Sequence, residues 1–138
     1  MITAVDTNIL VDVVEADATY GPRSAHALKR CLNEGQLLLS EVVWAETTAY
    51  FSTLEAAHHA IFELGAEFSP LNQKATDTAG QIWRKYRRAG GPRTRIIADF
   101  MIGAHAAVHA DRLITRDRGF YRHYFPKLDI INPTETVQ

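Results

Sequence analysis

Short apolar runs alternate along the chain with longer segments in which apolar residues recur at helical spacing. The short runs are mostly apolar, which is typical of strands that are buried on both faces of a parallel sheet. They predict strands at residues 2–5, 36–39, 66–69, 112–115 and 129–131. The first run continues into AVDTNILV, residues 4–11, a strand-like sequence in which Asp6 interrupts the apolar pattern.

Residues that favour helix ends divide the longer segments into five predicted helices. Ser or Asn can cap the first turn of four of them, and glycine ends three of these four. The helices run from Ser24 to Gly35, from Ser40 with Glu41 in the first turn, from Ser52 to Gly65, from Asn72 to the GGP sequence at 90–92, and from about Arg95 to His109. Strands separated by such helices imply right-handed crossovers and a parallel sheet covered on both faces. We therefore predict one α/β domain over residues 1–138, with three α/β/α layers and a central, mostly parallel five-stranded sheet.

Composition agrees with a folded globular domain, since 46% of the 138 residues are hydrophobic and 22% are charged. No apolar run approaches the roughly 20 residues of a membrane-spanning helix. Because a strand pattern begins at residue 2, we expect no cleavable signal peptide and a cytoplasmic protein. Cys31 is the only cysteine, so we expect no disulfide framework.

Charge is distributed unevenly along the chain, although the formal net charge is −1. Residues 1–83 carry four basic and eleven acidic side chains, whereas residues 84–122 carry ten basic and three acidic ones. The ten basic residues are Arg84, Lys85, Arg87, Arg88, Arg93, Arg95, Arg112, Arg116, Arg118 and Arg122. A basic run of this kind is either a solvated helix surface or a surface that attracts an anion, and charge alone leaves both open.

Four acidic residues are placed to meet at one edge of the predicted sheet. Asp6 closes the first strand and Asp117 follows the fourth, while Glu46 and Asp99 lie on helices that lead away from the same edge. In open parallel sheets, ligands bind outside the carboxyl ends of the strands. We therefore predict that the four carboxylates converge there.

A metal ion would account for these carboxylates. Each acid alone could cap a helix or lie on a solvated surface, but Glu46 and Asp99 stand among residues that belong in a core. Ionised carboxylates in such surroundings are paired or bind metal. Carboxylates with hydroxyl and amide neighbours, here Asn8 and Thr115, suit a hard cation such as Mg²⁺ or Mn²⁺.

The segments that hold the four acids resemble the four motifs of PIN-domain ribonucleases, in the same order. They are DTNIL at the end of the first strand, SEVVWAE after the second, ADFMIGAHA, and LITRDRGF. The likeness extends over nearly the whole chain. The length of the chain and its predicted elements are similar to those of the small VapC-type toxins, in which a PIN domain is the entire protein.

The resemblance implies site residues, a reaction and partners. It implies that Asp6, Glu46, Asp99 and Asp117 bind Mg²⁺, or Mn²⁺, and are catalytic, with Asn8 and Thr115 in support. It also implies cleavage of RNA, a homodimer, and inhibition by a small cognate antitoxin. Gly119 departs from the pattern, because many relatives have another acidic residue shortly after the fourth acid. The number of metal ions in the site, one or two, is therefore left open.

These observations together predict a Mg²⁺-dependent endoribonuclease that is the toxin of a type II toxin–antitoxin system. An acidic pocket alone would repel RNA, so a basic surface beside it is required. That requirement favours the anion-binding interpretation of the basic segment. The predicted RNA contacts are Arg84, Lys85, Arg87, Arg88, Arg93, Arg95, Arg116 and Arg118.

Two other functions fit parts of the sequence. A non-catalytic RNA-binding or interaction domain would have the same fold, but the presence of all four acids favours catalysis. A phosphotransferase with Asp6 as its nucleophile resembles the haloacid-dehalogenase pattern, which usually has a second acid where this chain has Asn8.

Two further groups of residues have competing interpretations. His105 and His109 have the spacing of a zinc-binding pair, but HAAVH lacks the intervening Glu, which favours an ordinary helix surface. Trp83 and Tyr86 could stack on RNA bases. Aromatic residues at helical spacing are more often part of a core, and we favour that interpretation.

Overall fold

The structure is a computed structural model that describes residues 1–92 and 94–135; the predicted RNA contact Arg93 lies outside these residues. Strands and helices alternate along most of the chain. The elements are β1 (Ile2–Val5), α1 (Thr7–Val14), α2 (Gly21–Glu34), β2 (Gln36–Leu39), α3 (Glu41–Thr48), α4 (Leu54–Glu63), β3 (Ala66–Phe68), α5 (Gln73–Arg88), α6 (Ile97–His109), β4 (Arg112–Ile114), α7 (Arg118–Tyr124) and β5 (Asp129–Ile131).

All five predicted strands form one sheet, in the order β3-β2-β1-β4-β5, and every neighbouring pair is parallel. The first strand of the chain is therefore the central one. Its Ala4 pairs with Leu38 of β2 on one side and with Leu113 of β4 on the other. The change of direction along the chain occurs at β1, which is the position where parallel sheets bind ligands.

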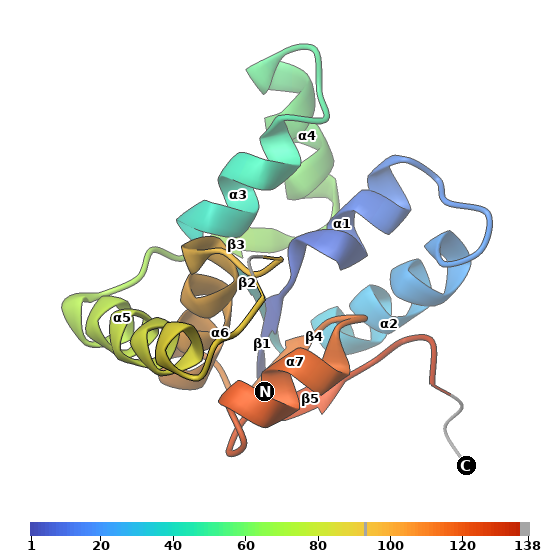
Figure 1. The fold of residues 1–138 in the computed structure, drawn as a ribbon. Helices are drawn as coiled ribbons and strands as arrows, with labels where there is room; N and C mark the ends of the chain where they lie inside the picture. Colours follow the sequence, from blue (N-terminus) through green and yellow to red (C-terminus); the bar gives the residue numbers. More distant parts are fainter. Residues whose placement is uncertain (93, 136–138) are drawn as a thin grey trace.

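Helices cover both faces of this sheet, as predicted for a three-layer α/β/α domain. Figure 1 shows α5 and α6 on one side of the strands and α1 and α2 on the other. Apolar side chains fill the space between layers: Leu39 and Leu113 of the strands, Ile9 of α1 and Phe100 of α6 are all buried. Burial of such side chains from water is the main favourable contribution to folding.

Aromatic rings join the helices on the α6 side. Phe100 of α6 contacts Tyr86 of α5, with ring centroids 5.3 Å apart, and Phe120 of α7 at 5.2 Å. The sequence analysis assigned Tyr86 to the core, and its side chain is buried. The cluster fixes the start of α6 against α7.

The helix caps were predicted in part. Ser40 and Asn72 cap α3 and α5 by accepting hydrogen bonds from Val43 N and Ala75 N. The prediction for Ser52 was wrong by one residue, because Thr53 caps α4. The prediction for Ser24 was also wrong, because α2 begins at Gly21 with Pro22 in its first turn, and Ser24 is buried inside it.

Two helices were not predicted. Residues 4–11 read as one strand-like run, but the strand ends at Val5 and α1 begins at Thr7, because Asp6 caps the helix. The other, α7, has only seven residues, too few for a clear helical period. Within residues 1–92 and 94–135, no helix has the length and apolar character that crossing a membrane requires.

Candidate active site

Asp6 stands where the central strand meets the first helix. Its backbone N–H donates to Ile114 O of β4 at 3.0 Å, which extends the ladder between the two strands. Its Oδ1 accepts from Thr7 N at 2.7 Å, so the same residue caps α1. The side chain is only 6% exposed. A carboxylate is thus fixed at the carboxyl edge of the sheet, as the sequence predicted.

The surroundings of Asp6 contain neutral donors. Thr115 Oγ1 donates to Oδ2 at 2.6 Å, and Asn8 Nδ2 donates to the same oxygen at 3.3 Å. None of the ion pairs found among the described residues involves Asp6. The pKa of Asp6 is raised to about 6, mainly by burial and also by the charges of Asp117 and Asp99, against the lowering effect of the hydrogen bonds.

Glu46 reaches this centre from α3. Its Oε1 accepts a hydrogen bond from Thr7 Oγ1 at 2.8 Å, and Thr7 is the residue that follows Asp6. Ser40 caps α3 and thereby sets the direction in which the helix leaves β2. The Glu46 side chain is exposed, so it can be reached from solvent.

Asp99 and Asp117 complete the group from the other side. Asp99 is in the first turn of α6, where its Oδ2 accepts from Ile96 N at 3.0 Å. Asp117 precedes α7, and its backbone N–H donates to Thr115 Oγ1 at 3.0 Å. Thr115 therefore bonds to both Asp6 and the backbone of Asp117. The structure brings all four sequence-predicted acids to one edge of the sheet.

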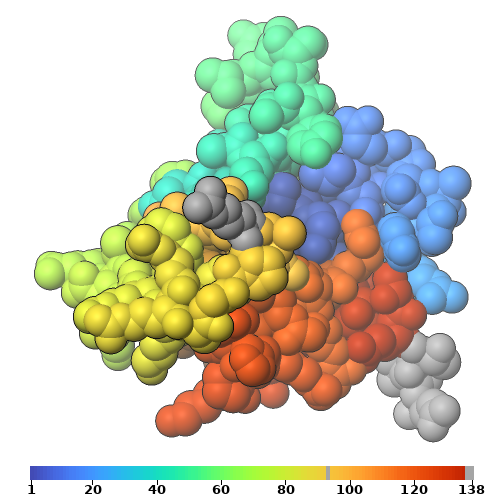
Figure 2. All heavy atoms as spheres, viewed as in Figure 1, coloured from blue at the N-terminus to red at the C-terminus, as the bar shows by residue number. Residues whose placement is uncertain are grey.

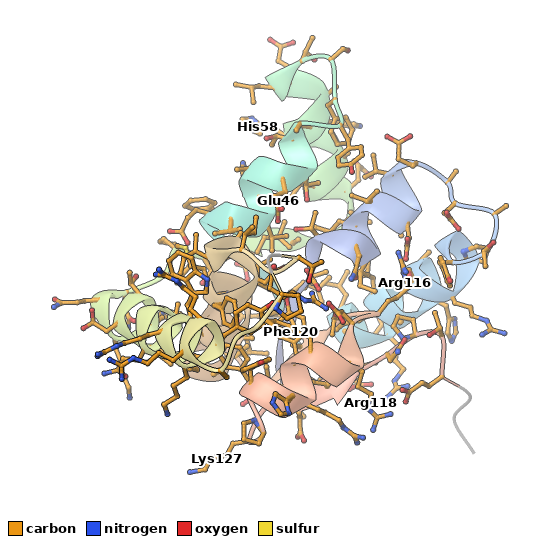
Figure 3. All side chains as sticks on the ribbon, in the orientation of Figure 1. Glu46, His58, Arg116, Arg118, Phe120 and Lys127 are labelled. Atoms are coloured by element: carbon orange, nitrogen blue, oxygen red, sulfur yellow. The ribbon has the colours of Figure 1, made fainter. Side chains whose placement is uncertain are left out.

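Figure 2 shows this region in the assembled surface. The dark-blue junction of β1 and α1 is set between the teal α3, the yellow segment before α6 and the orange α7. Glu46 on α3 and Phe120 on α7 border the region from opposite sides (Figure 3). The acids therefore lie where α3, the segment before α6, and α7 meet.

Arg95 brings a positive charge into the acid cluster. Its Nη1 donates to Asp117 Oδ2, forming an ion pair, and lies 4.0 Å from Asp99 Oδ1. Its guanidinium also lies over the Phe120 ring, 4.2 Å from the centroid. Arg95 was predicted to contact RNA. No residue near it in the sequence indicated that it pairs with the acids.

Tyr121 of α7 also lies beside the acids, and it was not predicted from the sequence. It is buried beside the cluster, and burial together with the charges of Asp6, Asp99 and Asp117 raises its phenol pKa well above the ordinary value. The phenol therefore stays neutral at physiological pH. Only its place in the first apolar turn of α7 distinguished it in the sequence.

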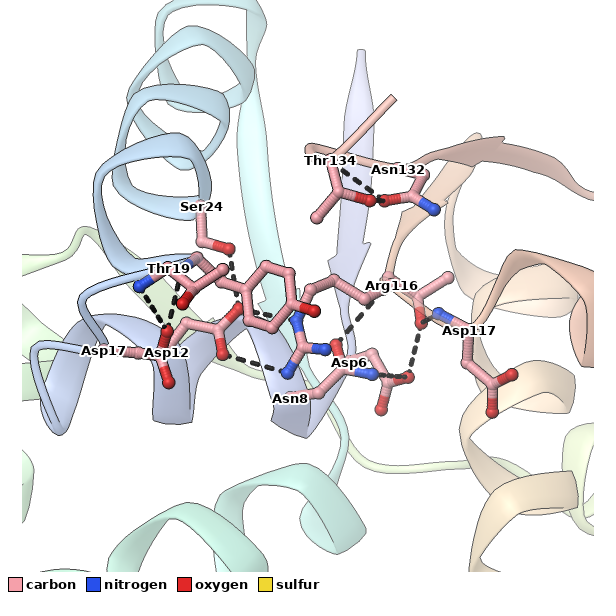
Figure 4. Close-up of polar contacts among 12 residues, drawn as sticks. Asp6, Asn8, Asp12, Asp17, Thr19, Ser24, Arg116, Asp117, Asn132 and Thr134 are labelled. Carbon is pink, nitrogen blue, oxygen red and sulfur yellow. Dashed lines mark hydrogen bonds and ion pairs between the residues drawn. The ribbon is translucent and has the colours of Figure 1, made fainter. Parts of the chain in front are cut away.

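Arg116 has a different environment from the one predicted for an RNA contact. Its Nε and Nη2 donate to the two carboxylate oxygens of Asp12 at 2.8 and 3.0 Å, and Ser24 Oγ donates to Asp12 Oδ2 at 2.8 Å. Its guanidinium lies 4.0 Å from the Tyr20 ring centroid. Figure 4 shows this network directly beside Asp6 and Asn8. Asn8 joins the two groups, since its Oδ1 accepts from Arg116 N at 3.3 Å.

The other predicted RNA contacts lie mainly on α5. Arg84, Lys85, Arg87 and Arg88 have exposed side chains in the last turns of this helix. Arg87 lies over the ring of Trp83, 5.0 Å from its centroid. Arg118 is half-buried and forms an ion pair with Glu135.

The donor atoms fit a hard divalent cation by type, since they are carboxylate oxygens with hydroxyl and amide oxygens nearby. Within the described residues, however, no three acidic or histidine side chains are close enough together to hold a metal ion as they stand. The guanidinium of Arg95 pairs with one of the four acids instead. Metal binding would therefore require the acid side chains to rotate and Arg95 to move.

The histidines of α6 have a structural environment. His105 is buried, its Nε2 lies 3.1 Å from Ser69 Oγ, and burial lowers its pKa to about 4. His109 Nε2 accepts from Asn72 N at 3.3 Å. No described side chain supplies a third ligand beside this pair.

Comparison with known proteins adds to this geometry. A comparison with curated protein sequences gives no match. Among solved structures, the chain is similar to VapBC2 from Rickettsia felis bound to a promoter DNA fragment, with 23% identity, a TM-score of 0.72, and 96% of this chain and 98% of that chain covered. It is also similar to VapBC-1 from nontypeable Haemophilus influenzae, with 21% identity, a TM-score of 0.73, and 98% and 100% covered.

A third solved structure has the same fold. FitAcB from Neisseria gonorrhoeae has 22% identity and a TM-score of 0.69, with 99% of this chain and 100% of that chain covered. The family model described as the PIN domain matches residues 3–126, which include all four acids. The chain therefore belongs to the PIN domain family.

Proposed function

We propose that the protein is a metal-dependent endoribonuclease and the toxin of a toxin–antitoxin pair. The observation that carries the proposal is Asp6, a buried carboxylate with neutral donors and two acids close enough to raise its pKa. Burying such a group costs free energy unless a cation compensates it. A buried carboxylate of this kind is therefore expected where its charge binds a cation or takes part in a reaction.

The proposed ligands of Mg²⁺, or of Mn²⁺, are Asp6, Glu46, Asp99 and Asp117. A divalent cation held there would supply a more acidic bound water and would neutralise charge on the reacting phosphate. Thr115 and Asn8 fix the orientation of the Asp6 carboxylate through their hydrogen bonds. Tyr121 is buried beside the acids, and its neutral phenol adds no charge to the cluster. Hydrolysis would leave a 5′-phosphate and a 3′-hydroxyl.

Substrate attraction is assigned to basic side chains close to the acids. Arg84, Lys85, Arg87 and Arg88 form an exposed basic surface on the end of α5. Arg95 lies between that surface and Asp117, so its guanidinium can contact a phosphate once its ion pair with Asp117 is broken. Arg116 is assigned to the support of α1 rather than to RNA, because Asp12 already holds its guanidinium.

The proposed partner rests on the similar solved structures. VapBC2 is bound to promoter DNA, and another similar structure, from Klebsiella pneumoniae, is a toxin–antitoxin complex with 20% identity and a TM-score of 0.68. By extension, we propose that the present chain is inhibited by a small cognate antitoxin. A homodimer and action in the cytoplasm belong to the proposal as implications of the resemblance to VapC-type toxins.

The test is RNA cleavage by the purified protein. Total RNA is incubated with the parent or with Asp6→Asn, in Mg²⁺ or in EDTA, and new 5′ ends are mapped. We expect defined cleavage sites only for the parent with Mg²⁺. RNA binding without cleavage by the parent would favour the non-catalytic RNA-binding alternative, and cleavage in EDTA would exclude a metal requirement.

A further inference from the structure

A pocket of about 310 Å³ lies between the end of α5 and the start of α6. Its lining includes Trp83 and Arg87 of α5, Pro92, Arg95 and Ile96. Together with Tyr86, the lining therefore provides two aromatic rings, apolar side chains and two guanidinium groups. Planar aromatic ligands that carry a negative charge suit such a lining, because the ring stacks while the guanidinium groups attract the charge.

Two apolar side chains that line this pocket are partly or largely exposed to solvent. Ile96, which directly precedes α6, is 57% exposed. Trp83 is only half-buried, and the guanidinium of Arg87 lies 5.0 Å from the centre of its ring. Part of Trp83 packs against the core, so the ring is held in place while part of it remains accessible.

The wall of the pocket is fixed by local contacts. Tyr86 Oη donates to Pro92 O, and Gly91 N donates to Tyr86 O at 3.0 Å. A Cβ atom at Gly91 would lie 2.5 Å from the Tyr86 ring, so the chain passes this ring at a distance that only glycine allows. A ligand would therefore meet a preformed wall.

Arg95 connects the pocket to the acid cluster. It lines the pocket and also pairs with Asp117 and approaches Asp99. The α5 surface beside it carries Arg84 and Arg88, which favour a polyanion over a basic peptide. A chain that alternates phosphates with aromatic bases matches both neighbouring sites, because a phosphate at the acids leaves an adjacent base near Trp83.

We propose that this pocket binds one nucleobase of single-stranded RNA, stacked on Trp83 and bordered by Arg87, next to the phosphate that is cleaved. The inference rests on the proposed function for its substrate and assigns to Trp83 a part in selecting the cleavage site. Stacking tolerates any base, so the size and polar groups of the pocket set the preference among bases.

Trp44 and Trp83 are the two tryptophans of the chain, so Trp44→Phe leaves Trp83 as the only indole reporter. This variant is titrated in EDTA with short single-stranded RNAs of each base, with duplex RNA, and with inorganic polyphosphate as a probe without bases. We expect single-stranded RNA to quench Trp83 fluorescence, and polyphosphate to bind without quenching it. Trp83→Phe, which keeps Trp44, is the matched control and should show little RNA-dependent quenching.

Two substitutions at Trp83 separate stacking from packing. Trp83→Leu keeps apolar volume but loses the aromatic face, and Trp83→Phe keeps a face. We expect about a tenfold loss of single-stranded RNA affinity for Trp83→Leu, in line with the stacking of one base on an aromatic ring, and a smaller loss for Trp83→Phe. The cleavage-site preference of Trp83→Leu should change as well. Arg87→Gln, on an exposed side chain, gives a second probe if Trp83→Leu fails to fold.

The outcomes distinguish this inference from the proposed function. Quenching of Trp83 by RNA in a parent protein that never cleaves would retain the pocket and reject the nuclease. Cleavage by the parent with unchanged affinity and unchanged cleavage sites in Trp83→Leu would reject the pocket alone. Equal quenching by polyphosphate would also reject it, as would quenching by duplex RNA alone.

Discussion

Helix α1 has a buried carboxylate at its N-cap and another near its end, and their partners differ completely. Asp12 is 3% exposed and accepts hydrogen bonds from Nε and Nη2 of Arg116 and from Ser24. Asp6 is 6% exposed and accepts only from a hydroxyl, an amide side chain and a backbone N–H. Both residues lie on the same short helix at nearly the same depth.

The difference separates a structural acid from a candidate functional one. The charge of Asp12 is compensated by a cation, so the pair holds α1 to the segment after β4. The charge of Asp6 is not compensated within the described residues, and its raised pKa reports that cost. Burial alone therefore does not mark a candidate functional acid, whereas burial without a cationic partner does.

The largest expected effect comes from replacing Asp6. We expect Asp6→Asn to lower RNA cleavage by at least about 100-fold, because a proposed metal ligand is lost. In EDTA it should unfold at the same temperature as the parent or higher, since a charge that is buried and repelled by two acids has gone. Cleavage rates and thermal melts of both proteins test this. A cleavage rate equal to that of the parent would remove Asp6 from the site.

Replacing Asp12 should have the opposite pattern. Asp12→Ala leaves Arg116 without its partner, and we expect a loss of about 3 kcal/mol in the free energy of unfolding. Denaturant titration measures this loss, and the double variant Asp12→Ala with Arg116→Ala should recover part of it. The single variant, where still folded, should cleave RNA far better than Asp6→Asn. A stability equal to that of the parent would show that the pair contributes nothing.

The pH dependence of stability should distinguish Asp6 as well. Its pKa is raised from 3.8 to about 6 in the folded protein, so the folded state binds more protons than the unfolded state between these values. Without metal, lowering the pH from 7 to 4 should therefore stabilise the parent relative to Asp6→Asn by roughly 2 kcal/mol. His105, with its lowered pKa, acts in the opposite direction but is present in both proteins. A difference that does not change with pH would mean that Asp6 is ordinarily solvated.

The smallest expected effect comes from replacing Arg95, the cation that pairs with Asp117. Its pair with Asp117 is about one third exposed, which limits its strength. We expect Arg95→Ala to bind Mg²⁺ about fivefold more tightly, since the metal no longer competes with a guanidinium for Asp117. Calorimetric titration of the RNA-free protein measures this, with Arg88→Ala as a control for the loss of one positive charge. Equal affinities of the two variants would show that Arg95 does not compete.

The placement of Asp6 and Asp117 could be predicted because it depends on local sequence. An acid that follows a short apolar run lies at a strand end, and parallel strands present their ends at one edge. Glu46 followed from α3, whose Ser40 cap was predicted, and Asp99 followed from a helix predicted by the spacing of its apolar residues. The sheet could be predicted for the same reason, since each strand is an apolar run between helices.

The pairing of individual charges could not be predicted in this way. Arg116 and Asp12 are 104 residues apart, and nothing local shows that they meet. The same holds for Arg95 and Asp117, which are 22 residues apart and precede two different helices, α6 and α7. The basic segment therefore looked uniform in the sequence, whereas the structure divides it into pairs that hold the fold and side chains that remain exposed.

The central position of β1 has a consequence for how the protein is made. Asp6 is synthesised 109 residues before Thr115, whose hydroxyl orients its carboxylate. Until β4 leaves the ribosome, one side of β1 has no neighbouring strand and α7 does not exist. Contacts between segments that are far apart in the sequence form late in folding. A nascent chain that has not yet reached Asp117 therefore cannot contain the complete acid cluster.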